Sequence, residues 1–146
     1  MDREIKFRGK DLEYGCWAYG DLKQHNDGDV LIGIHSQHWT DDGYSNPYYK
    51  EVRNVDEDTV GQYTGLKDKN GVEIYEGDIV DVWSQGSHIT DGIIKWGNGR
   101  CGFFIGNATN SMVWNLSGDQ YGCETLKVIG NIYDNPELIG GGEDKP

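Results

Sequence analysis

The chain has 146 residues, of which 25 are acidic and 13 basic, so its formal net charge at pH 7 is −12. Apolar residues make up 36% of the chain and aromatic residues 12%, a composition that can build a packed core and argues against intrinsic disorder. The acidic excess also argues against direct DNA or RNA binding, because neutralising phosphates requires clustered Lys and Arg.

Alternating apolar and polar residues predict three strands at the start of the chain. Residues 4–8 (Glu-Ile-Lys-Phe-Arg) alternate in this way, which indicates a half-buried strand with its apolar side chains inward. Residues 16–22 and 30–34 are two further strands, and Asn-Asp-Gly at 26–28 predicts a hairpin turn between them. Residues 35–47 are polar and contain Gly and Pro, which predicts a long loop.

The middle of the chain is expected to contain three short strands and one helical turn. Residues 48–52 indicate a strand, and the acidic sequence at 56–59 favours the start of a single helical turn. Residues 62–66 and 72–75 flank the Asn-Gly sequence at 70–71, the strongest short signal for a hairpin. The glycine of that turn is expected to adopt a positive φ, at which a β-branched residue would be destabilising.

The second half of the chain has the same pattern, in which short apolar segments alternate with glycine-rich turns. Strands are predicted at residues 79–83, 92–96, 101–105, 112–116 and 126–133. Trp83 and Trp96 fall in these strands and are expected in the core.

The predicted fold class is all-β, because the short strands recur at roughly 8–12-residue spacing with turn signals between them. We expect a two-part β fold with an N-terminal β subdomain over residues 1–60. An SH3-like β-barrel subdomain is expected over residues 61–139, followed by a disordered tail at 140–146.

The sequence also predicts a cytoplasmic protein. The N-terminal residues carry closely spaced charges and lack the apolar run of a secretory signal, and no apolar run approaches the length of a membrane span. Cys16, Cys101 and Cys123 are odd in number, widely spaced and without a C-x-x-C pair. This pattern fits reduced thiols better than disulfides or a zinc site.

Four blocks of sequence resemble the YopX family and occur in the same order as in that family. They are residues 3–8, 60–71, 74–80 and 128–138, and the second block (VGQYTGLKDKNG) is the most specific. The resemblance implies a mostly-β protein encoded by a bacteriophage or prophage. The family has no defined catalytic residues, so none is carried over to this chain.

Motifs for enzymatic chemistry are weak, and we predict no catalytic residue, no metal site and no cofactor. His35 and His38 form an H-x-x-H pair, but no third ligand accompanies them. The acidic sequences at 56–58 and 68–71 begin like calcium loops but lack the Glu at the twelfth position. The glycines at 97–99 indicate a hairpin instead of a phosphate loop. The chain is therefore predicted not to be an enzyme.

The polar loop and the residues after it carry aromatic side chains of the kind that anchor interfaces, beside carboxylates. The predicted partner-binding residues are Trp39, Asp41, Asp42, Tyr44, Tyr48 and Tyr49. Residues 11–60 hold eleven acidic and three basic side chains, a net charge of −8, which would steer a basic partner.

These observations predict a phage accessory protein that acts by stoichiometric binding of an unknown host or phage protein in the host cytoplasm. Two alternatives stay open: an acidic mimic of nucleic acid, and a small-ligand-binding oligomer. A homo-oligomer is expected in addition, because two small halves bury little core each and surplus aromatic residues are often buried between subunits.

Overall fold

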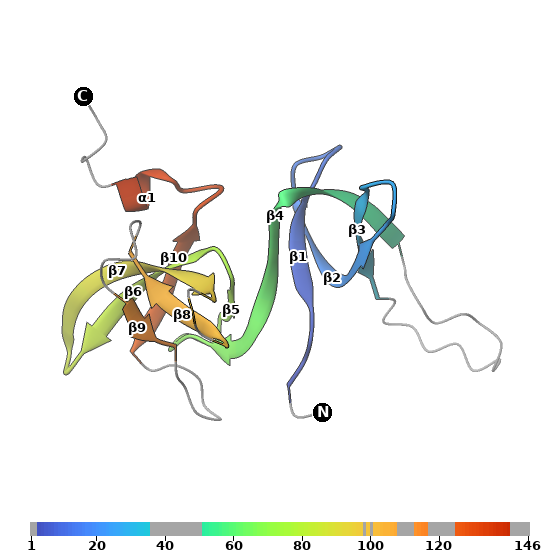
Figure 1. Cartoon of the computed structure of the whole chain (residues 1–146). Helices are drawn as coiled ribbons and strands as arrows, with labels where there is room; N and C mark the ends of the chain where they lie inside the picture. The colour runs from blue at the N-terminus through green and yellow to red at the C-terminus, as the bar shows by residue number, and fades with distance from the viewer. Residues whose placement is uncertain are drawn as a thin grey trace. The chain divides into compact units, whose positions relative to one another are not determined.

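The structure, a computed structural model, describes six parts of the chain: residues 3–35, 51–97, 99, 101–107, 113–116 and 125–140. These residues form ten β-strands and one short helix, so the protein is all-β, as the sequence predicts (Figure 1). The chain divides into two compact units, Met1–Gln62 and Tyr63–Pro146. In the described ranges, no helix has both the length and the apolar character needed to cross a bilayer.

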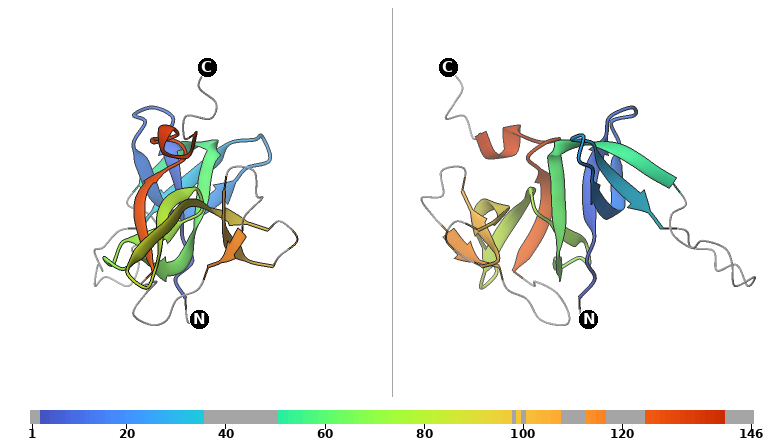
Figure 2. Two further views of the ribbon diagram at one scale, coloured as in Figure 1. Left: turned by 90° about the vertical axis from the view of Figure 1, so that its left-hand side faces the viewer. Right: turned by 45° about the vertical axis from the view of Figure 1, so that its right-hand side comes forward.

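The first unit is built from four antiparallel strands whose pairings run in a closed cycle. They are β1 (Phe7–Asp11), β2 (Trp17–Gln24), β3 (Val30–Ile34) and β4 (Glu51–Lys67), and β4 continues into the second unit. Each strand pairs with the next along the chain, and β4 also pairs with β1 (Figure 2). The predicted hairpin between β2 and β3 is confirmed: Gln24 lies opposite Val30, and Gly28 in the turn has a φ of 99°.

β1 begins later in the chain than predicted, and its buried side is different. Ile5, expected to be buried, precedes the strand and is 42% exposed, whereas Arg8, expected to face solvent, is 5% exposed. The Arg8 guanidinium lies over the ring of Trp17, 4.5 Å from its centroid, which helps to accommodate a buried charge. The core of the unit is formed by Ala18, Val30, Ile32 and Val55, and Phe7, which was expected to face inward, packs half-buried against it.

The acidic segment predicted to form a helical turn lies within β4, so that prediction is wrong. Lys10 lies opposite Asp56, but Arg8 lies opposite Gly61, which leaves extra residues on β4 as a bulge. Thr59 stabilises this bulge, because its hydroxyl donates to the carbonyl of Asp56 at 2.7 Å and accepts the Lys10 N–H at 2.9 Å. Sheet pairing therefore outweighs the local helical preference of the acidic residues.

The second unit contains the end of β4, six further strands and the helix. These elements are β5 (Glu73–Tyr75), β6 (Asp78–Ser84), β7 (Ser87–Trp96), β8 (Phe103–Gly106), β9 (Val113–Asn115), β10 (Leu126–Asn131) and α1 (Glu137–Gly140). β5 pairs with the end of β4, and the other strands form an antiparallel sheet in the order β10-β6-β7-β8-β9. The predicted strands of this half are confirmed, whereas closure into an SH3-like barrel stays a prediction. α1 ends at Gly140, and residues 141–146 of the predicted tail lie outside the described residues.

The predicted turn at residues 68–71 is confirmed, and the hydrogen bonds of Asp68 explain why an acid begins it. Gly71 has a φ of 81°, as expected. The Asp68 side chain is 1% exposed and accepts the N–H groups of Asn70 at 2.8 Å and Val72 at 2.9 Å. Its second oxygen accepts the N–H of Val128 on β10 at 2.8 Å. Asp68 therefore fastens the β4–β5 hairpin to β10.

The core of the second unit determines which residues of β6 face outward. It is formed by Ile74, Val80, Val82, Ile94, Ile105 and Leu126. Because side chains alternate along a strand, burial of Val80 and Val82 places Asp81 and Trp83 on the other face of the sheet. The prediction that Trp96 is a core residue is wrong: it is 54% exposed and packs edge-on against Phe103.

Candidate functional site

The residues predicted to bind a partner lie outside the described residues. They are Trp39, Asp41, Asp42, Tyr44, Tyr48 and Tyr49. Of the H-x-x-H pair only His35 is described, and its Nε2 lies 3.1 Å from Oδ1 of Asp21. Two other groups of described residues, one in each unit, form candidate sites.

The group in the second unit is centred on two carboxylates that face each other across β6 and β7. Asp81 of β6 lies directly opposite Asp91 of β7 in the antiparallel pair. Both side chains lie on the face of the sheet away from the core, as the alternation of β6 requires. Like charges directly opposite each other destabilise a sheet, so this pair is unfavourable without a neighbouring cation.

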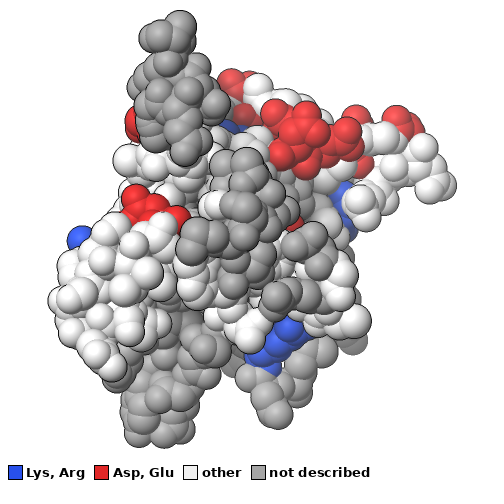
Figure 3. All heavy atoms as spheres, turned by 60° about the vertical axis from the view of Figure 1, so that its left-hand side comes forward, with Lys and Arg blue, Asp and Glu red and all other residues white. Residues whose placement is uncertain are grey.

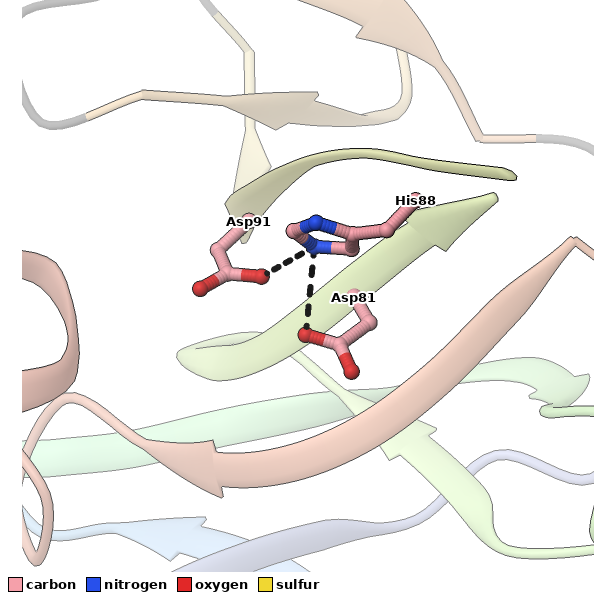
Figure 4. Close-up of side chains that lie close together, drawn as sticks. All are labelled: Asp81, His88 and Asp91. Atoms are coloured by element: carbon pink, nitrogen blue, oxygen red, sulfur yellow. Dashed lines mark hydrogen bonds and ion pairs between the residues drawn. The ribbon is translucent and has the colours of Figure 1, made fainter. Parts of the chain in front are cut away.

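His88 joins the two carboxylates because β7 contains a β-bulge. Val82 lies opposite Thr90, but Trp83 lies opposite His88, so Ile89 has no partner on β6. In a regular strand, side chains three residues apart point to opposite faces. The extra residue reverses this relation, and the imidazole faces both carboxylates (Figure 4).

The imidazole of His88 lies close to both carboxylates. His88 Nε2 lies 2.9 Å from Asp91 Oδ1 and 3.6 Å from Asp81 Oδ1. The hydrogen bond with Asp91, followed by burial, raises the pKa of Asp81 above its ordinary value. Burial alone would raise the pKa of Asp91, but its hydrogen bonds with Asp81 and His88 outweigh burial and lower that pKa. The two carboxyls therefore shift each other's pKa in opposite directions across the strand pair.

An aromatic ring, that of Trp83, and a positive charge, that of Lys127, lie next to the group. The rings of Trp83 and His88 meet edge-on with centroids 5.5 Å apart. Lys127 of β10 lies opposite Asp81, on the side away from Asp91. Its positive charge lowers the pKa of Asp81, but the hydrogen bond with Asp91 and burial outweigh this and raise it. The side chains of His88 and Asp91 are 44% and 37% exposed, so the group is accessible from solvent.

Sequence reasoning missed this group, which we call the Asp–His–Asp cluster (Asp81, His88 and Asp91). One ligand atom from each residue lies within 4.8 Å of the others, an arrangement that can hold a metal ion. Only Asp81 could have been singled out from the sequence, because it alternates with apolar residues and so is expected on the outer face of its strand. Nothing in the local sequence indicates the bulge that brings His88 to the same face.

The group in the first unit is an acidic groove, formed where the bulge of β4 lies beside the β2–β3 hairpin. The groove has a volume of about 340 Å³. Its lining residues are Leu22, Gln24, Val30, Glu57, Asp58 and Val60. Apolar side chains thus occur together with two exposed carboxylates. The turn that joins Gln24 to Val30 adds the exposed acids Asp27 and Asp29. Figure 3 shows that acidic side chains gather in a patch on one face of the molecule.

A second, larger groove of the first unit, of about 600 Å³, contains two carboxylates that share one guanidinium. Arg53 donates to Asp11 Oδ2 at 3.0 Å and to Glu51 Oε1 at 2.9 Å. The N–H of Tyr14, the Arg53 guanidinium and the N–H of Glu13 outweigh burial and lower the pKa of Asp11. These contacts satisfy the carboxylate from within the chain, so a structural role explains them.

Comparison with known proteins places the chain in a family. The sequence profile described as YopX protein matches residues 6–140. Among solved structures, the chain is similar to the crystal structure of protein EF1440 from Enterococcus faecalis. The sequence identity is 27% and the TM-score 0.58, and the match covers 94% of this chain and 99% of that chain. No curated protein matches significantly. Because the profile covers nearly the whole chain, the protein belongs to the YopX family.

Proposed function

We propose that this protein is a phage or prophage accessory protein that binds a basic protein partner stoichiometrically in the host cytoplasm. The observation that carries the proposal is the acidic groove of the first unit, where apolar side chains lie beside Glu57 and Asp58. Membership of the YopX family supports the phage or prophage origin in the proposal, which the resemblance implied.

The lining of the acidic groove suits a lysine or arginine side chain of a partner. Leu22, Val30 and Val60 offer apolar surface to the aliphatic stem of such a side chain, and the carboxylates of Glu57 and Asp58 can accept its charged end. Lysine and arginine commonly bury their stems in this way while the charge stays solvated. A neutral apolar partner would leave the carboxylates unpaired at the contact, so the groove favours a basic one.

The charge of the first half of the chain fits the same partner. Residues 11–60 carry a net charge of −8, which attracts a basic protein over a distance comparable to the Debye length. The predicted partner-binding residues, which include Trp39 and Tyr44, supply aromatic side chains of the kind that anchor interfaces. Rim carboxylates of this kind act mainly on the association rate, and their effect weakens as salt rises.

The proposal is tested by titrating the purified chain with a fluorescein-labelled lysine- and leucine-containing peptide and measuring fluorescence anisotropy. The double variant Glu57→Gln/Asp58→Asn should bind about 2- to 30-fold more weakly, if each carboxylate contributes roughly 0.2–1 kcal/mol. The control variant Glu4→Gln/Glu137→Gln removes the same charge from exposed positions outside the groove and should bind within twofold of the wild type. Equal weakening in both variants would show that only net charge matters and would overturn the assignment of the groove.

A homo-oligomer remains part of the proposal. Two units with separate cores leave aromatic surface, such as the 54% exposed Trp96, that a second copy can cover. Light scattering of the purified chain at micromolar concentration should give a multiple of 16.4 kDa. A monomer mass at that concentration would contradict this expectation.

A further inference from the structure

We propose that the Asp–His–Asp cluster of the second unit binds a divalent first-row transition-metal ion, with Zn²⁺ as the best-fitting ion. The proposal concerns residues, chemistry and a unit of the chain different from those of the acidic groove, so either proposal can fail without the other.

The donor atoms determine the class of metal. Two carboxylates and one imidazole nitrogen converge within 4.8 Å of one another, with His88 Nε2 nearest to both acids. Zn²⁺ accepts imidazole nitrogen and carboxylate oxygen together, and three protein ligands leave one position for water or another ligand. Ca²⁺ requires six to eight oxygen ligands, and Mg²⁺ a nearly ideal octahedron of oxygens, so both fit this set less well.

The arrangement of the strands is costly unless a cation is part of it. Asp81 and Asp91 are placed directly opposite each other, where like charges are destabilising by roughly 0.2–1 kcal/mol. The bulge that brings in His88 leaves Ile89 without a partner on β6 and 52% exposed to solvent. A bound divalent cation would turn the repulsion between the carboxylates into attraction, because it lies between them. Bulges that redirect a side chain are common beside functional sites.

A comparison within the same chain shows what the cluster has that an ordinary surface contact lacks. His35 also lies against a carboxylate, with Nε2 3.1 Å from Asp21 Oδ1, and both side chains are exposed. Among the described residues, only the Asp–His–Asp cluster brings together three such groups. His35 therefore provides a control: an exposed histidine that lies against the carboxylate of Asp21.

The first experiment measures Zn²⁺ binding to the untagged, chelator-treated full chain by isothermal titration calorimetry. We expect saturable binding of one Zn²⁺ per chain. His88→Gln and Asp91→Asn should each weaken it at least about 10-fold, because loss of even an indirect partner of a metal ligand typically costs 10- to 100-fold. His35→Gln should leave the affinity within twofold. Absence of saturable binding, or equal weakening in the His88 and His35 variants, would overturn the proposal.

A second experiment locates the ion by its effect on the neighbouring indole. Co²⁺ is a spectroscopically active substitute for Zn²⁺, and an ion held by His88 would lie close to Trp83, whose ring is 5.5 Å from the imidazole. Co²⁺ should quench part of the tryptophan fluorescence, and excess Zn²⁺ should reverse the quenching. In Trp83→Phe the Zn²⁺ affinity should persist while this quenching disappears. Unchanged quenching in Trp83→Phe would place the ion elsewhere and contradict the assignment.

Misfolding of the variants is separated from loss of ligands by their thermal unfolding without metal. His88, Asp81 and Asp91 lie outside the core, so the metal-free variants should melt close to the wild type. Zn²⁺ should then raise the melting temperature of the wild type and of His35→Gln, but not that of His88→Gln or Asp91→Asn. A Zn²⁺-induced rise of the same size in His88→Gln would contradict the proposal.

Discussion

The two units handle clustered carboxylates in opposite ways. In the first unit, Asp11 and Glu51 lie beside Arg53, whose guanidinium bonds to both, and the pKa of Asp11 is lowered. In the second unit, Asp81 and Asp91 face each other with only a histidine between them, and the pKa of Asp81 is raised. The guanidinium of the first cluster bonds to both acids, whereas in the second Lys127 lies opposite Asp81 alone, on the side away from Asp91. This difference separates a structural charge cluster from one that can take a cation from solution.

Asp68 shows that the second unit also contains an acid whose hydrogen bonds are supplied by the backbone of that unit. Its two oxygens accept three backbone N–H groups from Asn70, Val72 and Val128. In Asp68→Asn, one side-chain oxygen is replaced by an amide NH₂ group that faces a backbone N–H donor, so we expect a loss of about 3 kcal/mol of stability. Urea unfolding measures this loss. A change below about 1 kcal/mol would show that these hydrogen bonds do not hold the hairpin to β10.

Asp11→Asn breaks the self-contained cluster of the first unit and should lower the melting temperature clearly. The variant loses the charged acceptor of the Tyr14 and Glu13 N–H groups and the partner of Arg53. Glu51→Gln, which removes the more exposed of the two acids, serves as the control and should have the smaller effect. Thermal unfolding by circular dichroism compares the two. An equal effect of both variants would mean that the backbone contacts of Asp11 contribute little.

The pH dependence of the same variant follows from the lowered pKa of Asp11. A carboxyl whose pKa is lower in the folded state stabilises the protein above its unfolded pKa of about 3.9, and this contribution is lost as pH falls through the folded value. The difference in melting temperature between the wild type and Asp11→Asn should be constant from pH 7 to about pH 5 and shrink below about pH 4. A difference that grows on acidification would contradict the assigned sign.

Unlike Asp68→Asn and Asp11→Asn, which should destabilise the protein, Asp81→Asn should stabilise it in the absence of metal. Removing one of two opposed negative charges should raise the stability by roughly 0.2–1 kcal/mol, since like-charged cross-strand pairs are destabilising by about that amount. Urea unfolding of the metal-free protein measures the gain. A loss of stability would mean that the hydrogen bond between the carboxyls outweighs their repulsion, and the contrast between the units would disappear.

Lys127→Gln should produce the smallest effect. Lys127 lies opposite Asp81 on β10 and opposes any cation held there, while it supplies no ligand. Its neutralisation should strengthen Zn²⁺ binding about twofold at low salt and less at high salt, because the interaction is long-range and screened. Calorimetry at two salt concentrations tests this. Weaker binding in the variant would mean that the ion lies away from Asp81.

Local sequence determined the turns, and through them the all-β class of this protein. Asn-Gly at residues 70–71 and the glycine at residue 28 specify backbone conformations that depend on one or two residues, so their positions were predictable. The strands between the turns followed from the period of two in their side chains. Membership of the YopX family was also readable in the sequence, as the profile match over residues 6–140 confirms.

Only the tertiary structure decided the features that depend on pairing partners far away in the chain. The acidic segment around Asp58 became part of β4 because β1 pairs with β4 on both sides of it, at Asp56 and Gly61. Arg8 became buried with its guanidinium against the ring of Trp17. His88 reached Asp81 and Asp91 through a bulge in the register of two strands, which no window of local sequence specifies. Register depends on the sum of contacts along both strands, so the candidate metal ligands came together only in the folded sheet.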